Sequence, residues 1–478
     1  MSKFTCSHPP AGQTTELVMR VILTAGVWSG GLAAALLLPL CFNPYARVPF
    51  EPAKIALFWA ITAGMALAWL GSKGLSWRER RSIAAAAAAA QPARRPPLLV
   101  HVVLVYAAVV LLATVASVDR RLSLWGTADN PRGASTILAS VLFFLLLVDV
   151  LRRPAQVTRL IKALILASVP VVFYGFVQAL GLDPLPWISD SVSPVHAMLG
   201  RSNFLGAYLA MVAPWTLAMI VLGSRYGEDV HSTGGAAAWR FGLILCLQVA
   251  CLALTLARGA WLGLTVGCVV FLVLLAIRWR SRQLWLAAGL ALAIGCGVLA
   301  AMTFVRLPAG SQQAAAAGMS YPELRVESAW RRSVIWQHAL ALAPQRWPLG
   351  YGPATFQQVF ASRYPPGSLY QGRDAVVDDP HNLLLERLLA TGLLGLAAYA
   401  GVVAAFYGTG LALLRRSSNR RHDALLAAAL ASVAAYLTQA LFNPDVVVLS
   451  MLFWLALAVM LAVARMDTLL ADEDHGSR

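Results

Sequence analysis

Charged residues are scarce in this sequence. They make up 13% of its 478 residues, and 59% are hydrophobic, whereas a soluble domain usually carries about 25% charged residues. Apolar runs of about 20 residues, the length that crosses a bilayer, recur from residue 21 to residue 464. The runs at 98–117, 134–151 and 284–304 also lack the polar stripe of water-soluble helices. The sequence therefore predicts an all-α, polytopic membrane protein and excludes a soluble one.

Patterns that bind metals or nucleotides are also missing. Six cysteines occur, but no pair has the spacing of metal ligands and none lies in the longest polar segment. We therefore expect neither a zinc site nor a disulfide framework, and we interpret the cysteines in apolar runs as small buried hydrophobes. No glycine-rich nucleotide-binding motif is present. No cofactor and no metal are predicted.

Apolar runs separated by polar segments predict about 12 transmembrane helices. The first run follows a long polar tail and is long enough to span, so we interpret it as a membrane helix rather than a signal peptide. The predicted spans are residues 21–42, 53–71, 98–117, 134–151, 160–181, 203–223, 240–257, 260–277, 284–304, 393–414, 424–442 and 447–464.

The basic residues predict the orientation of the chain. A net charge of +16 could indicate nucleic-acid binding, but most lysines and arginines lie in short clusters between apolar runs, where they fix topology. We therefore expect no nucleic-acid partner, and we place the basic clusters, both termini and the linker 72–97 in the cytoplasm. The outward-facing segments are then 43–52, 118–133, 182–200, 258–259 and 305–380.

These assignments divide the chain into three parts. Residues 1–304 are predicted to form an N-terminal bundle of about nine helices. Residues 305–381 form an outward-facing loop domain, and residues 382–478 form the C-terminal helices with a short cytoplasmic tail. Prolines interrupt the loop domain, and between them residues 328–343 are predicted to form a helix with Ser328 as its N-cap.

Four arginines in the outward-facing segments are candidate anion ligands. Topology does not require basic residues there, and Arg258 lies in a turn with almost no polar loop, where a guanidinium is costly and usually functional. The planar guanidinium suits phosphate or pyrophosphate, because it binds two oxygens at once. The alternative is that each arginine reaches the lipid headgroups or pairs with a nearby aspartate. The four are Arg132, Arg201, Arg258 and Arg332.

A histidine at the end of the longest outer segment is a candidate general base. His381 follows Pro380 and opens an apolar helix. A neutral imidazole there could accept a proton from a hydroxyl near neutral pH. Asp378 and Asp379 could orient it or bind the group that supplies the hydroxyl, and Glu386 lies about a turn and a half further on. The alternative is an interfacial histidine that caps the helix.

Several motifs follow one another in a characteristic order. They are GRSNFLGAYLA at 200–210, Ala-Arg-Gly at 257–259, R-x-x-x-W from Arg332 to Trp336, GYGPATF at 350–356 and HNLLLERLLATGLLG at 381–395. Together with the topology they resemble the O-antigen ligase and O-antigen polymerase superfamily of membrane enzymes. The resemblance covers most of the chain and rests on the order of the motifs.

This resemblance implies a glycosyltransferase-C-like enzyme that is inverting and metal-independent. Such an enzyme moves a glycan from an undecaprenyl-pyrophosphate carrier to an acceptor hydroxyl at the periplasmic face of the bacterial inner membrane. Arg258 and Arg332 fall on the family's pyrophosphate-binding arginines, and His381 falls on its proposed general base. The missing nucleotide motif agrees with a donor other than a cytoplasmic nucleotide sugar.

Arg201 and Arg132 are expected to help bind the pyrophosphate. Arg201 stands where many members have an asparagine, in an Asn-Pro-Asn-Phe pattern of which only Asn203 and Phe204 match here. The expected supporting residues are Asn203, Trp336, Asp378, Asp379, Asn382 and Glu386.

The sequence leaves the acceptor open. A ligase joins the glycan to the lipid A core, which we favour, a polymerase joins it to another lipid-linked glycan, and a third relative joins it to protein serine or threonine. The short tail after residue 464 disfavours a protein acceptor. The expected partners are thus the undecaprenyl-pyrophosphate-linked donor, a glycolipid or glycan acceptor, and the bilayer.

Two functions of other classes compete with glycan transfer. A transporter or flippase for lipid-linked sugars needs ionisable residues along a central path, and the predicted spans hold few except near their outer ends. A non-catalytic glycolipid-binding protein is the other alternative.

Overall fold

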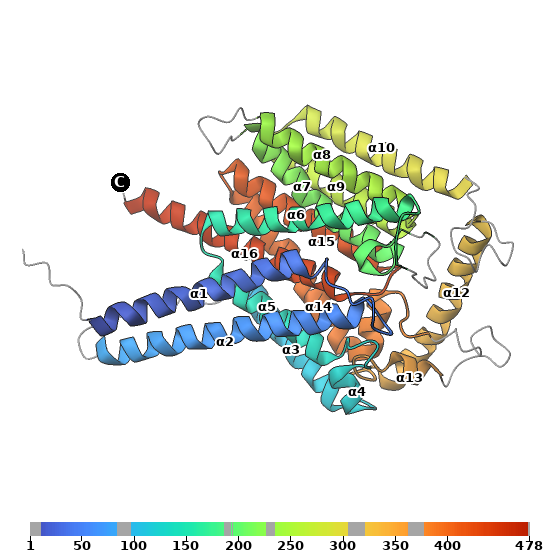
Figure 1. Ribbon diagram of the computed structural model, residues 1–478, viewed down its shortest axis with the longest axis horizontal. Coiled ribbons are helices and arrows are strands. Elements are labelled where there is room, and N and C mark those ends of the chain that lie inside the picture. The colour runs from blue at the N-terminus through green and yellow to red at the C-terminus, as the bar shows by residue number, and fades with distance from the viewer. Residues whose placement is uncertain are drawn as a thin grey trace, which may run out of the picture.

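The computed structural model is a bundle of long helices (Figure 1), and the part of the chain that it describes contains no strand. It describes residues 11–83, 97–185, 193, 195–225, 235–304, 321–361 and 377–476. Much of the predicted linker 72–97 and of the segment 305–380 therefore lies outside the described residues. Helices suit an apolar chain because each helix satisfies its own backbone hydrogen bonds without water.

Twelve long helices in the described ranges coincide with the twelve predicted apolar runs. Ten are long and apolar enough to cross a membrane, and the other two, α5 and α8, contain shorter apolar stretches. The prediction of an all-α polytopic membrane protein is thus confirmed, while the number of spans stays a prediction. The helices are α1 (Ala11–Leu37), α2 (Glu51–Ile83), α3 (Leu98–Val115), α5 (Ala134–Val150), α6 (Pro154–Ala179), α7 (Ser202–Arg225), α8 (Gly235–Leu254), α9 (Arg258–Trp279), α10 (Arg282–Phe304), α14 (Leu383–Arg416), α15 (Arg420–Ala440) and α16 (Val447–Gly476).

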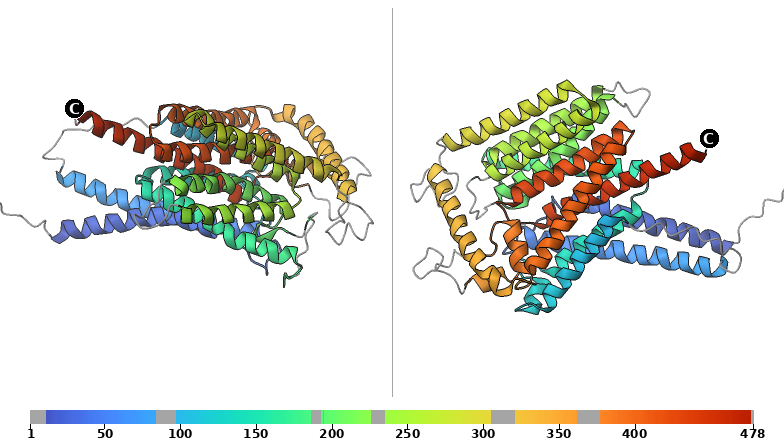
Figure 2. Two further views of the ribbon diagram at one scale, coloured as in Figure 1. Left: turned by 90° about the horizontal axis from the view of Figure 1, so that it is seen from above. Right: turned by 180° about the vertical axis from the view of Figure 1, so that it is seen from behind.

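Three helices form the centre of the bundle. At least 83% of the membrane-spanning window of α7, α15 and α16 is buried, against 11% for α10. Small residues allow close helix approach, since a Cβ added at Gly263 of α9 would lie 2.9 Å from the carbonyl oxygen of Ala435 in α15. Figure 2 shows α1 and α2 as a pair at the edge of the bundle. The three central helices are therefore enclosed by the others, whereas α10 is largely exposed at the edge of the bundle.

Three short or tilted helices gather at one end of the bundle. They are α4 (Arg120–Trp125), α12 (Tyr321–Leu342) and α13 (Phe356–Ala361). This end lies opposite the start of α1 and the end of α16 (Figures 1 and 2). The predicted outward-facing segments supply all three helices.

The predicted start of the helix in the loop domain is wrong. We expected residues 328–343 with Ser328 as N-cap, but α12 begins seven residues earlier, at Tyr321. Pro322 occupies the second position of the helix, where a proline is tolerated because its missing N–H has no intrahelical partner. No glycine or further proline follows before residue 342, so nothing in the sequence stops the helix at Ser328.

Helix α14 is broken at Gly392, and another segment fills the break. Gly392 has a φ of +67° inside an otherwise helical run. The segment 347–352 lies against it and donates to two carbonyl groups before the break, while two amides after the break donate to the segment. These bonds are Tyr351 N to Leu389 O (2.7 Å), Gly352 N to Ala390 O (3.0 Å), Leu393 N to Trp347 O (2.7 Å) and Leu394 N to Pro348 O (3.3 Å). The GYGPATF and ATGLLG motifs therefore dock the loop domain onto α14.

Gly392→Ala should destabilise the protein. The added Cβ would lie 2.4 Å from the carbonyl oxygen of Pro348, and a left-handed conformation costs a non-glycine residue about 1–3 kcal/mol. We expect a lower apparent Tm in detergent and a smaller folded fraction. Gly408→Ala is the matched control, because this glycine of α14 has no atom within 4 Å of an added Cβ. An unchanged Tm for Gly392→Ala would contradict the close approach.

Candidate functional site

Two arginines from distant parts of the chain lie close enough to influence one another. Arg258 is the first residue of α9, and Arg332 lies in the middle of α12. Burial lowers the pKa of Arg332, and the like charge of Arg258 lowers it further. Arg258 is exposed and Arg332 is partly buried. Two neighbouring cations favour binding of an anion, because the anion removes their mutual repulsion. The structure thus brings together the two arginines that the motifs singled out.

His381 is held from both sides in a left-handed conformation, with φ +53°. Its backbone N–H donates to Oδ1 of Asp379 over 2.6 Å. The carbonyl oxygen of the same peptide group, that of Pro380, accepts a hydrogen bond from the indole Nε1 of Trp336 over 2.9 Å. Trp336 lies one helical turn after Arg332, so the same face of α12 carries a candidate pyrophosphate ligand and positions the candidate base.

The imidazole of His381 lies among charged groups. Burial lowers its pKa to about 4, Arg332 adds to the shift together with Arg201 and Arg132, and Asp378 opposes it. The ring is therefore neutral near pH 7 and able to accept a proton. These mutual effects also show that three of the four candidate arginines converge on His381, while the fourth, Arg258, acts on Arg332.

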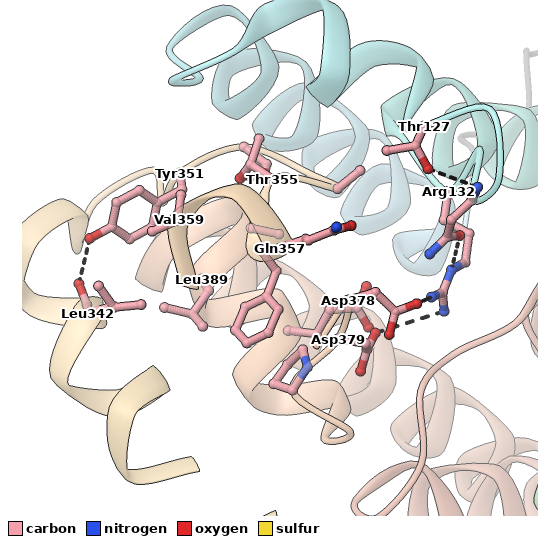
Figure 3. Close-up of a pocket in the computed structure, with 17 residues that line it drawn as sticks. Thr127, Arg132, Leu342, Tyr351, Thr355, Gln357, Val359, Asp378, Asp379 and Leu389 are labelled. Carbon is pink, nitrogen blue, oxygen red and sulfur yellow. Dashed lines mark hydrogen bonds and ion pairs between the residues drawn. The ribbon is translucent and has the colours of Figure 1, made fainter. Parts of the chain in front are cut away.

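Arg132 is balanced by carboxylates. Its Nη2 lies 3.8 Å from Oδ2 of Asp378, and its Nη1 lies 3.8 Å from Oδ2 of Asp379 (Figure 3). The guanidinium also donates to the carbonyl oxygen of Asp445. Although burial opposes the charge, these acids together with Glu51 and Glu386 raise the pKa of Arg132. The pairing with an aspartate that we weighed from the sequence thus exists for this arginine.

Asp379 has an unusual environment for a carboxyl group. Burial and then Glu386 raise its pKa, Arg132 acts in the opposite direction, and the resulting pKa is about 8. Its Oδ1 is occupied by the backbone N–H of His381. Asp379 therefore orients His381 through the main chain, whereas the sequence had suggested an orienting role without specifying how.

Two supporting asparagines hold helix ends. Asn203 of α7 donates from Nδ2 to Oδ1 of Asn443 over 2.8 Å, which joins α7 to the loop after α15. Asn382 caps α14, because its Oδ1 accepts the amides of Leu384 and Leu385. The cap of this helix is consequently Asn382, and the alternative interpretation of His381 as a helix cap is wrong.

Arg201 lies exposed just before α7, with its guanidinium carbon 5.9 Å from the ring centroid of Phe204. It acts on His381 from outside the more buried arginines. Arg201 stands where many members of the family have an asparagine, so this chain has a cation at the exposed edge of the arginine cluster. Its side chain is free of any large burial cost.

Sequence reasoning missed a buried ion pair below the site. Arg387 of α14 and Asp445 lie 3.0 Å apart, and their side chains are 8% and 9% exposed. The guanidinium carbon of Arg387 is 5.5 Å from the ring centroid of Tyr399. The sequence signal for this pair was a charged residue, Arg387, next to an apolar run. Helix α14 begins ten residues before the run predicted at 393–414, so Arg387 was not assigned to the predicted helix.

Residues 241–400 match the O-antigen ligase family. This region, about a third of the chain, is therefore similar to an O-antigen ligase domain. The match confirms the resemblance to this superfamily and relates the protein to glycan transfer in O-antigen or related pathways. The matched region contains Arg258, Arg332 and His381, whereas Arg132 and Arg201 precede it. A search of curated proteins finds no match to the chain.

Trp336→Phe should slow turnover without weakening substrate binding. Phenylalanine keeps the ring but loses the hydrogen bond to Pro380, which is worth about 0.5–1.5 kcal/mol, or about 2–10-fold in rate. We expect kcat to fall by that factor and the donor KM to stay unchanged. Trp347→Phe is the control, since this indole is 58% exposed. A change in KM alone, or an equal loss in the control, would remove Trp336 from the positioning of His381.

Proposed function

We propose that the protein transfers a glycan from undecaprenyl pyrophosphate to an acceptor hydroxyl at the periplasmic face of the inner membrane. The observation that carries this proposal is the contact of Trp336, one turn after Arg332 on α12, with the carbonyl oxygen of Pro380, which holds His381 beside the arginines. Burial and Arg332 lower the pKa of His381, and Arg258 lies close to Arg332. A base beside paired cations suits a reaction in which a hydroxyl loses a proton while a pyrophosphate leaves. The O-antigen ligase match supports the same chemistry. We favour the lipid A core as acceptor.

The proposed step is a single inverting displacement. The acceptor oxygen attacks the anomeric carbon on the face opposite the pyrophosphate. The new carbon–oxygen bond forms as the bond between the anomeric carbon and the phosphate oxygen breaks, and the electron pair leaves with undecaprenyl pyrophosphate. His381 takes the hydroxyl proton and later releases it to water. Arg258 and Arg332 stabilise the charge that develops on the leaving pyrophosphate, so we propose that no metal ion is required.

A polymerase, a protein-directed transferase and a transporter remain as competing proposals. The ionisable residues discussed above gather at one end of the bundle, which favours catalysis at one surface over passage through the membrane. A polymerase would lengthen the lipid-linked glycan, a ligase would release the free carrier and glycosylate a glycolipid, and a transporter would form no new bond.

Turnover by the purified protein tests the proposal. Full-length protein is incubated with undecaprenyl-pyrophosphate-linked glycan and lipid A core, with and without EDTA, and products are separated by size and lipid content. We expect a glycosylated lipid A core and free undecaprenyl pyrophosphate at equal rates in both conditions. Inhibition by EDTA that a divalent cation reverses would contradict the metal-independent step, and movement of unmodified donor across vesicles would favour a transporter.

A further inference from the structure

A pocket opens beside the residue that precedes His381. Its lining includes Pro380 and comes from the loop before α5, the segment 351–359 and the segment 378–390 (Figure 3). Its open space of about 660 Å³ includes the solvent at its mouth. The pocket is therefore an open cleft beside the residue that precedes the candidate base.

The polar lining of this pocket differs in charge from the arginine cluster. Three carboxyl groups line it, of which Asp379 has a pKa raised to about 8, whereas Arg201, Arg258 and Arg332 do not line it. The single basic residue among the lining residues is Arg132, which pairs with Asp378 and Asp379. Amide and aromatic groups complete the wall. The lining residues that the argument uses are Asn130, Phe356, Gln357, Asp378, Asp379 and Glu386.

We propose that this pocket receives the acceptor sugar as a ring without phosphate, either neutral or amine-bearing. The proposal rests on the proposed function, because it assigns the arginines to the donor and the pocket to the acceptor. Carboxylates and amides accept and donate hydrogen bonds to sugar hydroxyls, and the ring of Phe356 offers an apolar surface to the carbon–hydrogen face of a sugar. The ring is supported by Phe360, 4.9 Å away between centroids.

Charge decides which sugars fit. A phosphorylated ring would bring its negative charge next to Asp378 and Glu386 in a partly desolvated site, and like charges in contact oppose binding. An ammonium group would instead pair with the same carboxylates. The arginines therefore receive the anionic donor and the pocket receives a non-anionic acceptor. The carboxyl groups of the pocket keep the pyrophosphate from binding there.

Saturation-transfer NMR on full-length protein in detergent tests the assignment with three probes: methyl α-glucoside, methyl α-glucosaminide and glucose 6-phosphate. We expect signals from the first two and none from the phosphate. Asp378→Asn should reduce the preference for the amine over the neutral sugar by about 2–5-fold and leave the neutral sugar bound. Asp129→Asn is the matched control, because this aspartate lies 52% exposed in the same outer loop as Arg132.

Phe356→Ala should abolish binding of the glucoside and the glucosaminide, and Gln357→Ala, at an exposed position, serves if the first variant does not fold. Inorganic pyrophosphate titrated into the same proteins separates the two proposals. Pyrophosphate binding without any sugar signal, or sugar signals that persist in both pocket variants, would overturn the acceptor pocket and leave the proposed function standing. Sugar binding by a protein that binds no pyrophosphate would count against the donor assignment instead.

Discussion

Replacing His381 by alanine is expected to lower the rate of glycan transfer by about 10²–10⁴-fold, the usual loss when a general base is removed. The backbone at this position is left-handed, so His381→Asn is the better companion variant, because asparagine tolerates this conformation and has no basic nitrogen. Both variants should express normally and still bind the lipid-linked donor. The measurement is transfer by purified protein at saturating donor and acceptor.

His338→Ala provides the control for this result. Like His381, His338 belongs to the loop domain. It lies on α12, and its ring packs against that of Phe360 with centroids 6.4 Å apart. We expect its removal to leave the rate within a few-fold of the wild type. Near-normal turnover by His381→Asn would remove the imidazole from the mechanism and direct attention to Asp378 and Asp379.

The same histidine should give two different pH profiles. The pKa of His381 is lowered to about 4 by burial and then by Arg332, and the neutral form is the base. In the free enzyme, kcat/KM should therefore hold as the pH falls and decline only near pH 4. Bound pyrophosphate offsets the positive charge of the arginines and raises the pKa of the imidazole, so kcat should decline at a higher pH than kcat/KM. Declines in the reverse order would contradict this arrangement.

The second large effect is expected at the paired arginines. Arg332→Ala and Arg258→Ala should each lower kcat by about 10²–10³-fold, the cost of removing one group that stabilises developing charge. Arg258→Lys and Arg332→Lys keep the charge but lose the two-pronged guanidinium, and one lost charge-assisted hydrogen bond of roughly 1.5–3 kcal/mol corresponds to a loss of at least ~10-fold. The measurement is turnover together with titration of inorganic pyrophosphate.

Arg121→Lys is the control for the arginine series, since Arg121 is exposed on α4 at the same end of the bundle. It should retain wild-type turnover and pyrophosphate binding. If Arg258→Lys and Arg332→Lys fold and also retain full rates, the two arginines only anchor the protein at the membrane surface. Arg332→Ala should additionally raise the pKa of His381, because a positive charge that disfavours the imidazolium has been removed.

The sequence alone determined the class of the protein and the identity of its long helices. Composition and run length are local properties, and an apolar run in a membrane has to be helical because no water is present to satisfy the backbone. The twelve runs therefore coincide with the helices that the structure describes, and the order of motifs pointed to the superfamily. Helix ends were less predictable, as the early start of α12 shows, because the stop signals in the sequence were weak.

Only the tertiary structure decided how the candidate residues divide. Arg258 and Arg332 lie near each other as like charges. Arg132 instead contacts Asp378 and Asp379 and donates to the carbonyl oxygen of Asp445, 313 positions away. The four arginines looked alike in sequence, since each was predicted to lie on the outward-facing side near an apolar run. Whether an arginine lies beside a carboxylate or beside another cation depends on contacts between distant segments, which no local pattern encodes.

The broken helix α14 illustrates the same limit. Glycine at 392 is compatible with an ordinary helix, and its left-handed conformation is stable only because the segment 347–352 supplies partners for the backbone groups on both sides of the break. That docking carries the loop domain onto the bundle and brings Trp336 to the carbonyl oxygen of Pro380. The sequence supplied the base and the arginines, and the fold set the distances between them, because backbone hydrogen bonds between remote segments form only once the chain is packed.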